Sequence, residues 1–445
     1  MKTVFEKLPA TAFLLGEQPV DKATVYRRAS FCVVTKVGDT YIAYNTLTKE
    51  LAELDLREAD ALEAESVIFS PEYEQLIRGY FLVPQNHDDK KLCDGVTVFA
   101  RSAYRGSAYR RFTVFTTTDC NARCFYCYER GIKHMDMCDD TARRVADFIV
   151  RASEGEAVSI TWYGGEPLMN TSAMDIISSA LSAAGVEYTS MMATNASLFD
   201  DALIKKAVDL WHTDRVQITL DGTREVYDRI KAYSDRESGF EMVLSNIQKL
   251  LDCGIKVNIR LNVGGHNIAD MHALTNLLAD RFGGRRGLNV YAALLFDECE
   301  WASRGSTDCD RYELAKEIIK IGDIAAERGI LHPKKLYRTV SHCFCKADAE
   351  DALVITAEGK IVKCDFFTDS RFVGDVESGI DEEKLQDSRL LYSRRIECGG
   401  CMAYPICLRL AACPTGGCDD ARKFMTEERL VRSVRYLYAS AREKR

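Results

Sequence analysis

The 445-residue sequence has no long hydrophobic run, no excess of basic residues and no recognisable export signal. A membrane-spanning helix needs roughly 18 or more apolar residues in a row, so we expect no transmembrane segment. The 59 Lys and Arg residues are outnumbered by 67 Asp and Glu, which gives a net charge of −8 at pH 7. Nucleic acids bind basic surfaces, so this balance argues against such a partner. Without an export signal, the expected compartment is the reducing cytoplasm.

Cysteine is the residue in excess, with seventeen copies. A chain of this length needs no disulfides to hold its core, and clustered cysteines in a reducing compartment more often bind metal or take part in chemistry. The first cluster is Cys120, Cys124 and Cys127. The second is C-terminal and comprises Cys343, Cys345, Cys364, Cys398, Cys401, Cys407, Cys413 and Cys418. The remaining six are scattered singly, which is typical of core-filling residues.

The first segment of the chain predicts a small mixed domain. Strand-like runs at 30–37 and 41–45 flank a Gly38-Asp39 turn, and 51–56 is a possible third strand. Helix-favouring stretches follow at 57–65 and 72–78, and the run 79–84 closes the unit. Three strands followed by short helices suggest a winged-helix-like domain. The polar stretch 88–95 is typical of a linker.

The middle of the chain alternates regularly between strand-like and helical patterns. The predicted strands are 112–117, 158–163, 188–193, 216–220, 257–263 and 288–295. The predicted helices are 140–152, 172–184, 200–210, 240–252 and 268–281. Six βα repeats predict an α/β fold with parallel strands, and six rather than eight favour a partial (β/α)6 TIM-like barrel or an open sheet. Sites on such folds gather at the carboxyl ends of the strands.

Two motifs follow the first two predicted strands. Cys120-x3-Cys124-x2-Cys127 offers three thiolates that can face one iron–sulfur cluster and leave one iron without a protein ligand. His134 could instead complete a zinc site. The second motif is Gly164-Gly165-Glu166-Pro167, in which the glycines let the backbone approach a ligand closely and Glu166 offers a carboxylate suited to an ammonium group. A plain turn would explain the second motif equally well.

Together the two motifs resemble the radical S-adenosylmethionine superfamily over about residues 110–300. The resemblance implies that the three cysteines hold a [4Fe-4S] cluster whose open iron chelates S-adenosylmethionine. It also implies that an electron from the cluster, supplied by a donor such as flavodoxin or ferredoxin, generates a 5′-deoxyadenosyl radical. Residues implied to contact S-adenosylmethionine are Gly164, Gly165, Glu166, Pro167, Asn195 and Thr219. Turn and capping roles are the alternative for Asn195 and Thr219.

Arg260 alternates with apolar residues on the predicted strand 257–263. Its side chain could therefore point into a barrel interior, where it would be a further cofactor-binding candidate. A position on the polar rim at the end of the strand is the alternative.

The C-terminal cysteines resemble the SPASM extension of radical enzymes that act on peptides and proteins. Gly359-x4-Cys364 and Cys398-x2-Cys401-x5-Cys407 carry this resemblance, which implies two auxiliary [4Fe-4S] clusters. Eight thiolates would ligate two cubanes fully. The pattern departs from the family after Cys407, which leaves open to which auxiliary cluster Cys413 and Cys418 belong. Cys343 could belong to neither ligand set. Zinc ribbons are the alternative for this region.

Two features bear on the substrate. Asp365 follows Cys364 as a proposed base does in the related sulfatase-maturing enzymes, although a solvated or capping role would also fit. The segments 41–50 and 79–84 resemble leader-peptide recognition elements of ribosomal-peptide maturases, in which a leader adds as a strand to a sheet edge. A small capping domain is the alternative.

The sequence therefore predicts three units: residues 1–95 for leader-peptide recognition with a linker, 96–310 for the radical core, and 311–445 for the SPASM domain. The predicted function is a peptide maturase that abstracts hydrogen from a precursor peptide and forms a crosslink, with a thioether favoured as in sactipeptides and ranthipeptides. Carbon–carbon crosslinking, epimerisation and sulfatase maturation are the enzymatic alternatives. A non-catalytic iron–sulfur or zinc scaffold is the remaining one.

Overall fold

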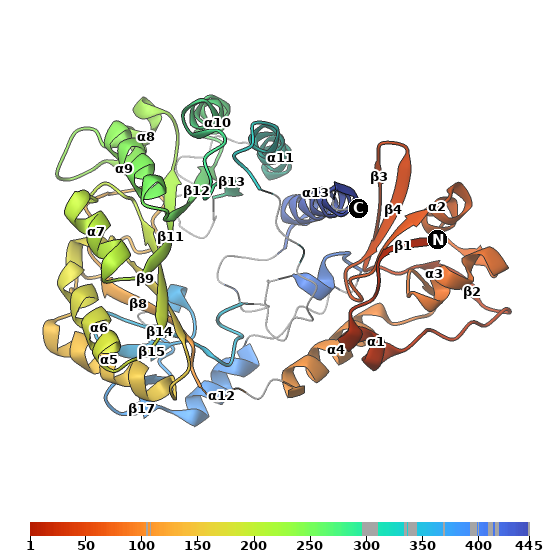
Figure 1. Cartoon of the computed structure of the whole chain (residues 1–445), viewed down its shortest axis with the longest axis horizontal. Coiled ribbons are helices and arrows are strands. Elements are labelled where there is room, and N and C mark those ends of the chain that lie inside the picture. Colours follow the sequence, from red (N-terminus) through yellow and green to blue (C-terminus); the bar gives the residue numbers. More distant parts are fainter. Residues whose placement is uncertain are drawn as a thin grey trace.

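A computed structural model gives the architecture of the chain (Figure 1). It describes residues 1–103, 106, 108–295, 310–332, 336, 345–367, 370–391, 398, 400–407, 413 and 418–443. Cys299, Cys309 and Cys343 lie outside these residues. Whether Cys343 is a ligand therefore stays a prediction from the sequence.

Six parallel strands in sequence order form most of the largest sheet. They are β8 (Arg111–Thr117), β9 (Val158–Gly164), β10 (Tyr188–Thr194), β11 (Thr213–Leu220), β12 (Lys256–Val263) and β13 (Leu288–Leu294). Each lies within a few residues of its predicted range, and the sheet is open rather than a closed barrel. The α/β prediction with parallel strands is therefore confirmed.

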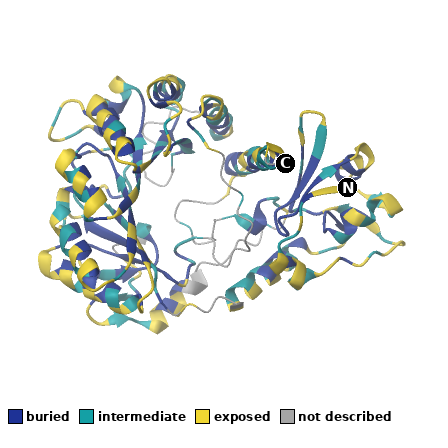
Figure 2. Ribbon diagram, in the orientation of Figure 1, coloured by how far each residue is buried: buried dark blue, intermediate teal, exposed yellow. Residues whose placement is uncertain are grey.

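Helices cover one face of this sheet (Figure 1). They are α5 (Asp139–Ala152), α6 (Thr171–Ala183), α7 (Asp201–Asp209), α8 (Arg224–Lys231), α9 (Phe240–Asp252) and α10 (Ile268–Phe282). The strands of this sheet are largely buried (Figure 2), and strand residues such as Trp162, Ile218 and Ile259 are fully buried in the main hydrophobic core. The alternate residues are mostly half-buried. We call the second face of the sheet, which carries these half-buried residues, its open face.

The sheet continues beyond β8 into the C-terminal part of the chain. β14 (Ala352–Ile355) pairs with β8 in parallel, and β15 (Lys360–Val362), β16 (Gly374–Asp375) and β17 (Gly379–Ile380) follow antiparallel. α12 (Glu382–Leu391) comes next. Asp351 pairs with Arg111 and secures the start of the β14–β8 contact. The region after residue 330, predicted to be rich in loops, thus contributes four strands to the central sheet.

The N-terminal part contains two small sheets and several helices. One sheet has the order β1-β5-β4-β3, from β1 (Lys2–Phe5), β5 (Leu51–Leu54), β4 (Thr40–Asn45) and β3 (Cys32–Val37). The other has the order β6-β2-β7, from β6 (Val67–Ile68), β2 (Val25–Arg28) and β7 (Leu82–Pro84). The helices are α1 (Pro9–Leu15), α2 (Leu56–Glu63), α3 (Glu74–Arg78) and α4 (Asp89–Ala103). The predicted linker at 88–95 is therefore mostly the first half of α4, and β1, β2 and β6 are additional strands.

The terminal helix α13 (Asp420–Glu443) connects the two halves of the molecule. It packs against β3 on one side and against α11 (Arg311–Glu327) on the other (Figure 1). Arg435 donates to Thr35 Oγ1 at 2.9 Å, and Arg432 forms a bidentate ion pair with Asp323 on α11. Within the described residues, no helix combines the length and the apolar character that crossing a bilayer would need.

Candidate active site

The first cysteine cluster forms the loop that follows β8, at the carboxyl edge of the parallel sheet. Cys120, Cys124 and Cys127 line one cavity of about 150 Å³. They line it rather than meet at one point, because no three His, Cys, Asp or Glu side chains among the described residues are close enough to hold a single metal ion. His134, the alternative zinc ligand, also lines the cavity, but its Nδ1 lies 3.0 Å from Asp119 Oδ1.

Backbone contacts fix the shape of this loop. The Arg123 amide donates to the Lys231 carbonyl at 2.7 Å, and the Ser234 amide donates to the Asn121 carbonyl at 2.8 Å. Tyr126 donates to Asp221, which also forms a buried ion pair with Lys231 at 2.9 Å. The residues between the cysteines therefore anchor the loop on the end of β11 and on α8, which leaves the thiols to face the cavity.

The thiols are held in a low-dielectric environment. Burial raises the pKa of Cys120 to about 12 and that of Cys127 to about 11. Burial also raises the pKa of Cys124, although Lys231 acts in the opposite direction. Thiols bind iron as thiolates, so iron binding here would release their protons. Three such thiols around one cavity fit the ligand set of an iron–sulfur cluster with one open iron.

Gly164 and Gly165 press against the backbone of the cysteine loop. A Cβ on Gly164 would lie 2.0 Å from the Thr117 carbonyl oxygen, and one on Gly165 would lie 2.1 Å from that of Asp119. The backbone of Gly164 also has φ +122, which favours glycine. The two glycines therefore allow the end of β9 to meet the cysteine loop, and Gly165 also lines the cavity. Pro167 is buried at the start of a short 3-10 helix, Pro167–Asn170.

Glu166 is fully buried, and its carboxylate is fully engaged. One oxygen accepts from Thr194 Oγ1 at 2.7 Å and from the Leu168 amide at 3.3 Å, and the other accepts from the Asn195 amide at 2.7 Å. Burial raises the pKa of Glu166 to about 7, against the effect of these hydrogen bonds. In this arrangement Glu166 ties the end of β9 to the end of β10.

Asn195 continues this connection to the cysteine loop. Its Nδ2 donates to Asn121 Oδ1 at 2.8 Å and lies 3.9 Å from Cys120 Sγ. The structure thus brings Asn195, Glu166 and the glycines around the cysteine loop.

Arg260 and Thr219 lie beside each other on the open face of the sheet. They are register partners on β12 and β11, and Arg260 is paired in turn with Tyr291 on β13. Arg260 is close enough to Tyr163 on β9 to act on the pKa of its phenol, which burial raises most strongly. Of the two positions considered for Arg260, the structure therefore favours the interior. We call the space on this side of the sheet, beside Thr219, Arg260 and Tyr163, the chamber.

Asp365 reaches the same chamber from the C-terminal part of the chain. Gly359, with φ +82, makes the turn between β14 and β15, and Cys364 and Asp365 follow β15. Asp365 Oδ2 accepts from Lys346 Nζ at 2.8 Å. Phe366 stacks on Tyr128 with ring centroids 4.6 Å apart, so the loop of Cys364 contacts the loop of Cys127.

The C-terminal cysteines divide between two places. Near β15, burial raises the pKa of Cys345, and Asp365 and Cys413 raise it further. Burial also raises the pKa of Cys364, and Cys345 adds to that rise. At the second location, burial raises the pKa of Cys401, and Glu427, Cys407 and Cys418 add to that rise. Cys413 therefore lies with the first set and Cys418 with the second.

Cys398 and Cys401 pack against the N-terminal core. The Cys401 amide donates to the Cys398 carbonyl at 3.3 Å, which closes the Cys-x2-Cys turn. This turn therefore places Cys398 and Cys401 beside the N-terminal core.

Glu129 is a site residue that the motifs do not reveal. It lines the cavity of the three thiols, is only 8% exposed, and neither carboxylate oxygen has a hydrogen-bond partner among the described residues. Its only signal in the sequence is its position two residues after Cys127.

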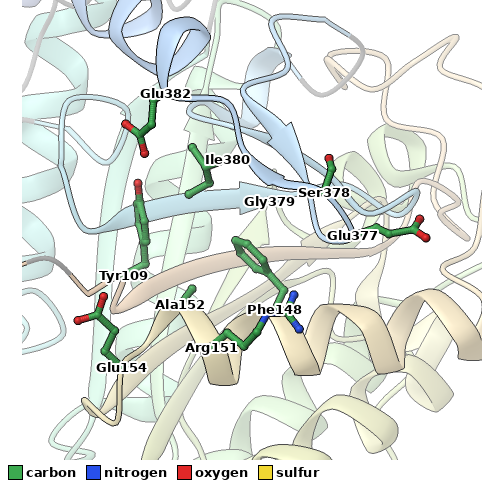
Figure 3. Close-up of a pocket in the computed structure, with 10 residues that line it drawn as sticks. All are labelled: Tyr109, Phe148, Arg151, Ala152, Glu154, Glu377, Ser378, Gly379, Ile380 and Glu382. Carbon is green, nitrogen blue, oxygen red and sulfur yellow. The ribbon is translucent and has the colours of Figure 1, made fainter.

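A larger hollow of about 570 Å³ lies elsewhere, at the opposite end of β8 (Figure 3). It is lined by Tyr109 before β8, by Arg151 and Glu154 near the end of α5, and by residues around β17. None of the cysteines lines it. Since sites on parallel sheets form at the carboxyl ends of the strands, the smaller cavity with the three thiols is the stronger candidate.

Comparison with known proteins agrees with this geometry. The sequence model of the radical SAM superfamily matches residues 114–278. Among curated proteins, Fe-coproporphyrin III synthase of Methanosarcina barkeri is 26% identical over 234 residues, which cover 51% of this chain and 54% of that protein. GTP 3′,8-cyclase of Clostridium perfringens is 33% identical over 149 residues, or 32% of this chain and 43% of that enzyme. The chain thus spans about half the length of the curated relatives it matches.

Solved structures resemble the fold over more of the chain. Native anSMEcpe with bound AdoMet has a TM-score of 0.57 at 15% identity, covering 75% of this chain and 99% of that one. Streptococcus suis SuiB bound to precursor peptide SuiA has a TM-score of 0.54 at 12% identity, covering 89% of this chain and 99% of that one. At these identities the likeness concerns the fold. The match to the radical SAM superfamily model, at residues 114–278, lies within this fold.

Proposed function

Starting from the match to the radical SAM superfamily model at residues 114–278, we propose that the protein is a radical S-adenosylmethionine peptide maturase. The observation that carries this proposal is the cavity at the carboxyl end of the parallel sheet, which the half-buried Cys120, Cys124 and Cys127 line together with Gly165. When bound there, a [4Fe-4S] cluster supplies the electron that cleaves S-adenosylmethionine and gives a 5′-deoxyadenosyl radical.

In this proposal the chain itself positions the reactants. Cys120, Cys124 and Cys127 hold the cluster, and the turn at Gly164–Pro167 with Asn195 shapes the place for the methionine part. Thr219 and Arg260 line the open face of the sheet, where the nucleoside part fits. This open face also leaves room for the substrate residue that loses a hydrogen atom.

The second part of the proposal concerns two auxiliary [4Fe-4S] clusters in the C-terminal segment. The grouping of Cys345, Cys364 and Cys413, with Cys343 as the possible fourth ligand, supports one cluster. The grouping of Cys398, Cys401, Cys407 and Cys418 supports the other. Asp365 stands beside the first group and faces the chamber, so it is the candidate base for a substrate thiol or hydroxyl. An electron donor such as flavodoxin or ferredoxin completes the scheme.

We propose a ribosomally made precursor peptide as substrate, with a thioether crosslink as the favoured product. The likeness to the fold of SuiB, a protein solved with its precursor peptide, supports a peptide partner. A leader would add as a strand to a sheet edge of the N-terminal domain. Since β1 occupies the edge of β5 and α13 contacts β3, such a strand would add to the outer edge of β1, displace β1 or use the second sheet.

Anaerobic reconstitution tests the core of the proposal. The reduced protein should convert S-adenosylmethionine to 5′-deoxyadenosine, measured by liquid chromatography, and three cubanes would give about twelve irons per chain. Cys124→Ala should abolish cleavage, whereas Cys253→Ala, at an exposed cysteine after α9, should leave it unchanged. A reconstituted wild-type protein that forms no 5′-deoxyadenosine would refute the proposal.

The substrate is tested separately. Asp365→Asn should keep the cleavage of S-adenosylmethionine and impair modification of the peptide, and a variant that modifies peptide normally would exclude Asp365 as the base. Carbon–carbon crosslinking and epimerisation use the same hydrogen abstraction, and mass spectrometry of the product distinguishes them. Sulfatase maturation is disfavoured by the N-terminal domain, because the sulfatase-maturing enzymes lack one.

A further inference from the structure

The open face of the parallel sheet carries positive charge. Its half-buried positions on β9 to β13 include Arg215 and Arg260 and contain no aspartate or glutamate. The chain as a whole has a net charge of −8, so this face has the opposite sign to the molecule that carries it. A protein surface of one sign raises the local concentration of ligands of the other sign. The chamber is therefore suited to an anionic group.

A further guanidinium reaches this face from the terminal helix. Arg429 of α13 donates to the Ala292 carbonyl of β13 at 2.7 Å, which fixes its head group beside that strand. The next residue back, Tyr291, belongs to the open face. Burial raises the pKa of the Tyr291 phenol, and Arg260 and Arg429 both act against that rise. The two guanidinium groups therefore lie near the same phenol.

The phenol of Tyr291 leaves the donor role to the guanidinium groups. Its hydroxyl donates to Gln217 Oε1 at 2.9 Å, across the intervening strand β12. A guanidinium has five N–H donors, and the described residues accept from one nitrogen of Arg429. Arg429 is also exposed, so a ligand in the chamber can reach its remaining N–H groups.

The carboxylates nearby are paired with other cations. Asp365, which reaches the chamber from the C-terminal part of the chain, accepts from Lys346 at 2.8 Å. Asp323, which faces α13 from α11, forms its bidentate ion pair with Arg432. Within the described part of the chain, Arg429 therefore has a backbone carbonyl as its partner and no carboxylate. A carboxylate delivered with the ligand would supply the counter-charge.

We propose that Arg429 binds a carboxylate of the peptide substrate, and that Arg260 adds positive charge beside it. The chamber would then select a peptide that carries an aspartate, a glutamate or its own C-terminal carboxylate close to the residue that loses hydrogen. The inference rests on the proposed function, since it takes a peptide as the molecule that enters the chamber. A guanidinium can hold a carboxylate by two parallel N–H···O bonds, which fixes its orientation as well as its charge.

Peptide selection without turnover tests this assignment. Iron-loaded protein with S-adenosylmethionine and no reductant is immobilised and used to select from displayed random peptides that contain one fixed cysteine and a free C-terminus. Wild-type protein should enrich aspartate and glutamate, or the cysteine should lie near the C-terminus. Arg429→Met should lose that preference. Lys423→Met, which removes the same charge at an exposed position of the same helix, is the matched control and should keep it. A wild-type selection with neither preference would overturn the proposal.

Synthetic peptides then identify the source of the carboxylate. The most enriched peptide is compared with a copy in which the acidic residue is its amide and with a copy whose C-terminus is amidated. The change that removes the bound carboxylate should weaken binding roughly tenfold to a hundredfold in wild-type protein, measured by fluorescence anisotropy. In Arg429→Met the same change should have an effect of about twofold or less. Equal losses in the two proteins would overturn the contact with Arg429.

S-adenosylmethionine also carries a carboxylate, so its Kd is measured in parallel by equilibrium dialysis. Arg429→Met should keep that Kd within about twofold of the wild-type value. A loss of about tenfold or more would assign Arg429 to the cofactor and overturn the proposal.

A second variant covers a failure of Arg429→Met to fold. Arg429→Lys keeps the charge and loses the planar fork, so it should retain part of the acidic preference. A complete loss in a folded Arg429→Lys protein that still binds S-adenosylmethionine would count against a charge contact. The two proposals also fail separately. A protein that prefers acidic peptides but forms no 5′-deoxyadenosine would refute the enzymatic function alone, and one that cleaves S-adenosylmethionine without that preference would refute this inference alone.

Discussion

At the scale of single residues, the site combines positions that the sequence reveals with positions that it hides. Spacing alone identified the three cysteines, because a cluster needs several thiolates on one loop. Spacing could not show that Glu166 accepts hydrogen bonds from Thr194 and Asn195, since those donors come from the end of another strand. Nor could it identify Glu129, because a buried carboxylate without a partner is a property of the folded chain.

The contact of Gly165 with the cysteine loop gives a first prediction. In Gly165→Ala the new methyl group would lie 2.1 Å from the Asp119 carbonyl oxygen, which is backbone and cannot move aside freely. We expect a loss of about 1–3 kcal/mol in stability and reduced iron binding. Calorimetry and iron analysis measure the two effects. Gly95→Ala is the control, because nothing lies within 4 Å of a Cβ at that helical position. Normal iron content in Gly165→Ala would contradict the prediction.

Glu50 gives a prediction about pH. Burial raises the pKa of this carboxyl from 4.5 to about 7, against the effect of Lys7. The folded state therefore binds the proton more tightly than the unfolded state, and the stabilisation present below about pH 4.5 is lost as the pH rises through 7. Glu50→Gln stays neutral, so its stability relative to wild type should increase by about 1–3 kcal/mol between pH 5 and pH 8. Thermal unfolding at the two pH values measures this, and a pH-independent difference would exclude Glu50 as the cause.

At the scale of elements, regular repeats were predictable and isolated pairings were not. The strands β8 to β13 alternate with helices, and each carries its own apolar pattern, so the sequence located all six. β1 and β14 are runs of four residues whose partners lie far away in the chain, β1 on β5 and β14 on β8. The residues of such a short run do not indicate which distant strand it pairs with.

The position of β1 leads to a prediction about peptide binding. Its register places Thr3 opposite Ala52, and Val4 is buried beside α13. Deleting residues 1–8 should leave the edge of β5 open. A fluorescent peptide with the sequence of residues 1–7 should then bind the truncated chain and bind the full chain poorly, as fluorescence anisotropy would measure. The same peptide with Val4→Asp should not bind. Equal binding to both chains would show that β1 does not control this edge.

At the scale of the whole molecule, the cysteine-rich segment connects the two halves. Tyr404 donates to Asp94 at 2.6 Å and Thr46 donates to the Met402 carbonyl at 2.8 Å, so the Cys398–Cys407 part sits on the N-terminal domain. Cys364 instead follows a strand of the central sheet. The order of these cysteines along the chain does not predict this division, because Cys413 acts on the pKa of Cys345 and Cys418 on that of Cys401.

This division predicts which cysteine variants act on the same cluster. If Cys364 and Cys413 hold one auxiliary cluster and Cys418 belongs to the other, each single alanine variant should lose about four irons. The double variant Cys364→Ala/Cys413→Ala should lose no more than either single one, because the second change acts on a cluster already lost. Cys364→Ala/Cys418→Ala should lose about eight, since each change removes a separate cluster. Iron analysis after identical anaerobic reconstitution gives the counts, with Cys253→Ala as the control. Additive iron loss in the first pair, or non-additive iron loss in the second, would mean that Cys413 and Cys418 exchange clusters. The route by which the C-terminal segment joins the substrate chamber to the N-terminal domain would then change as well.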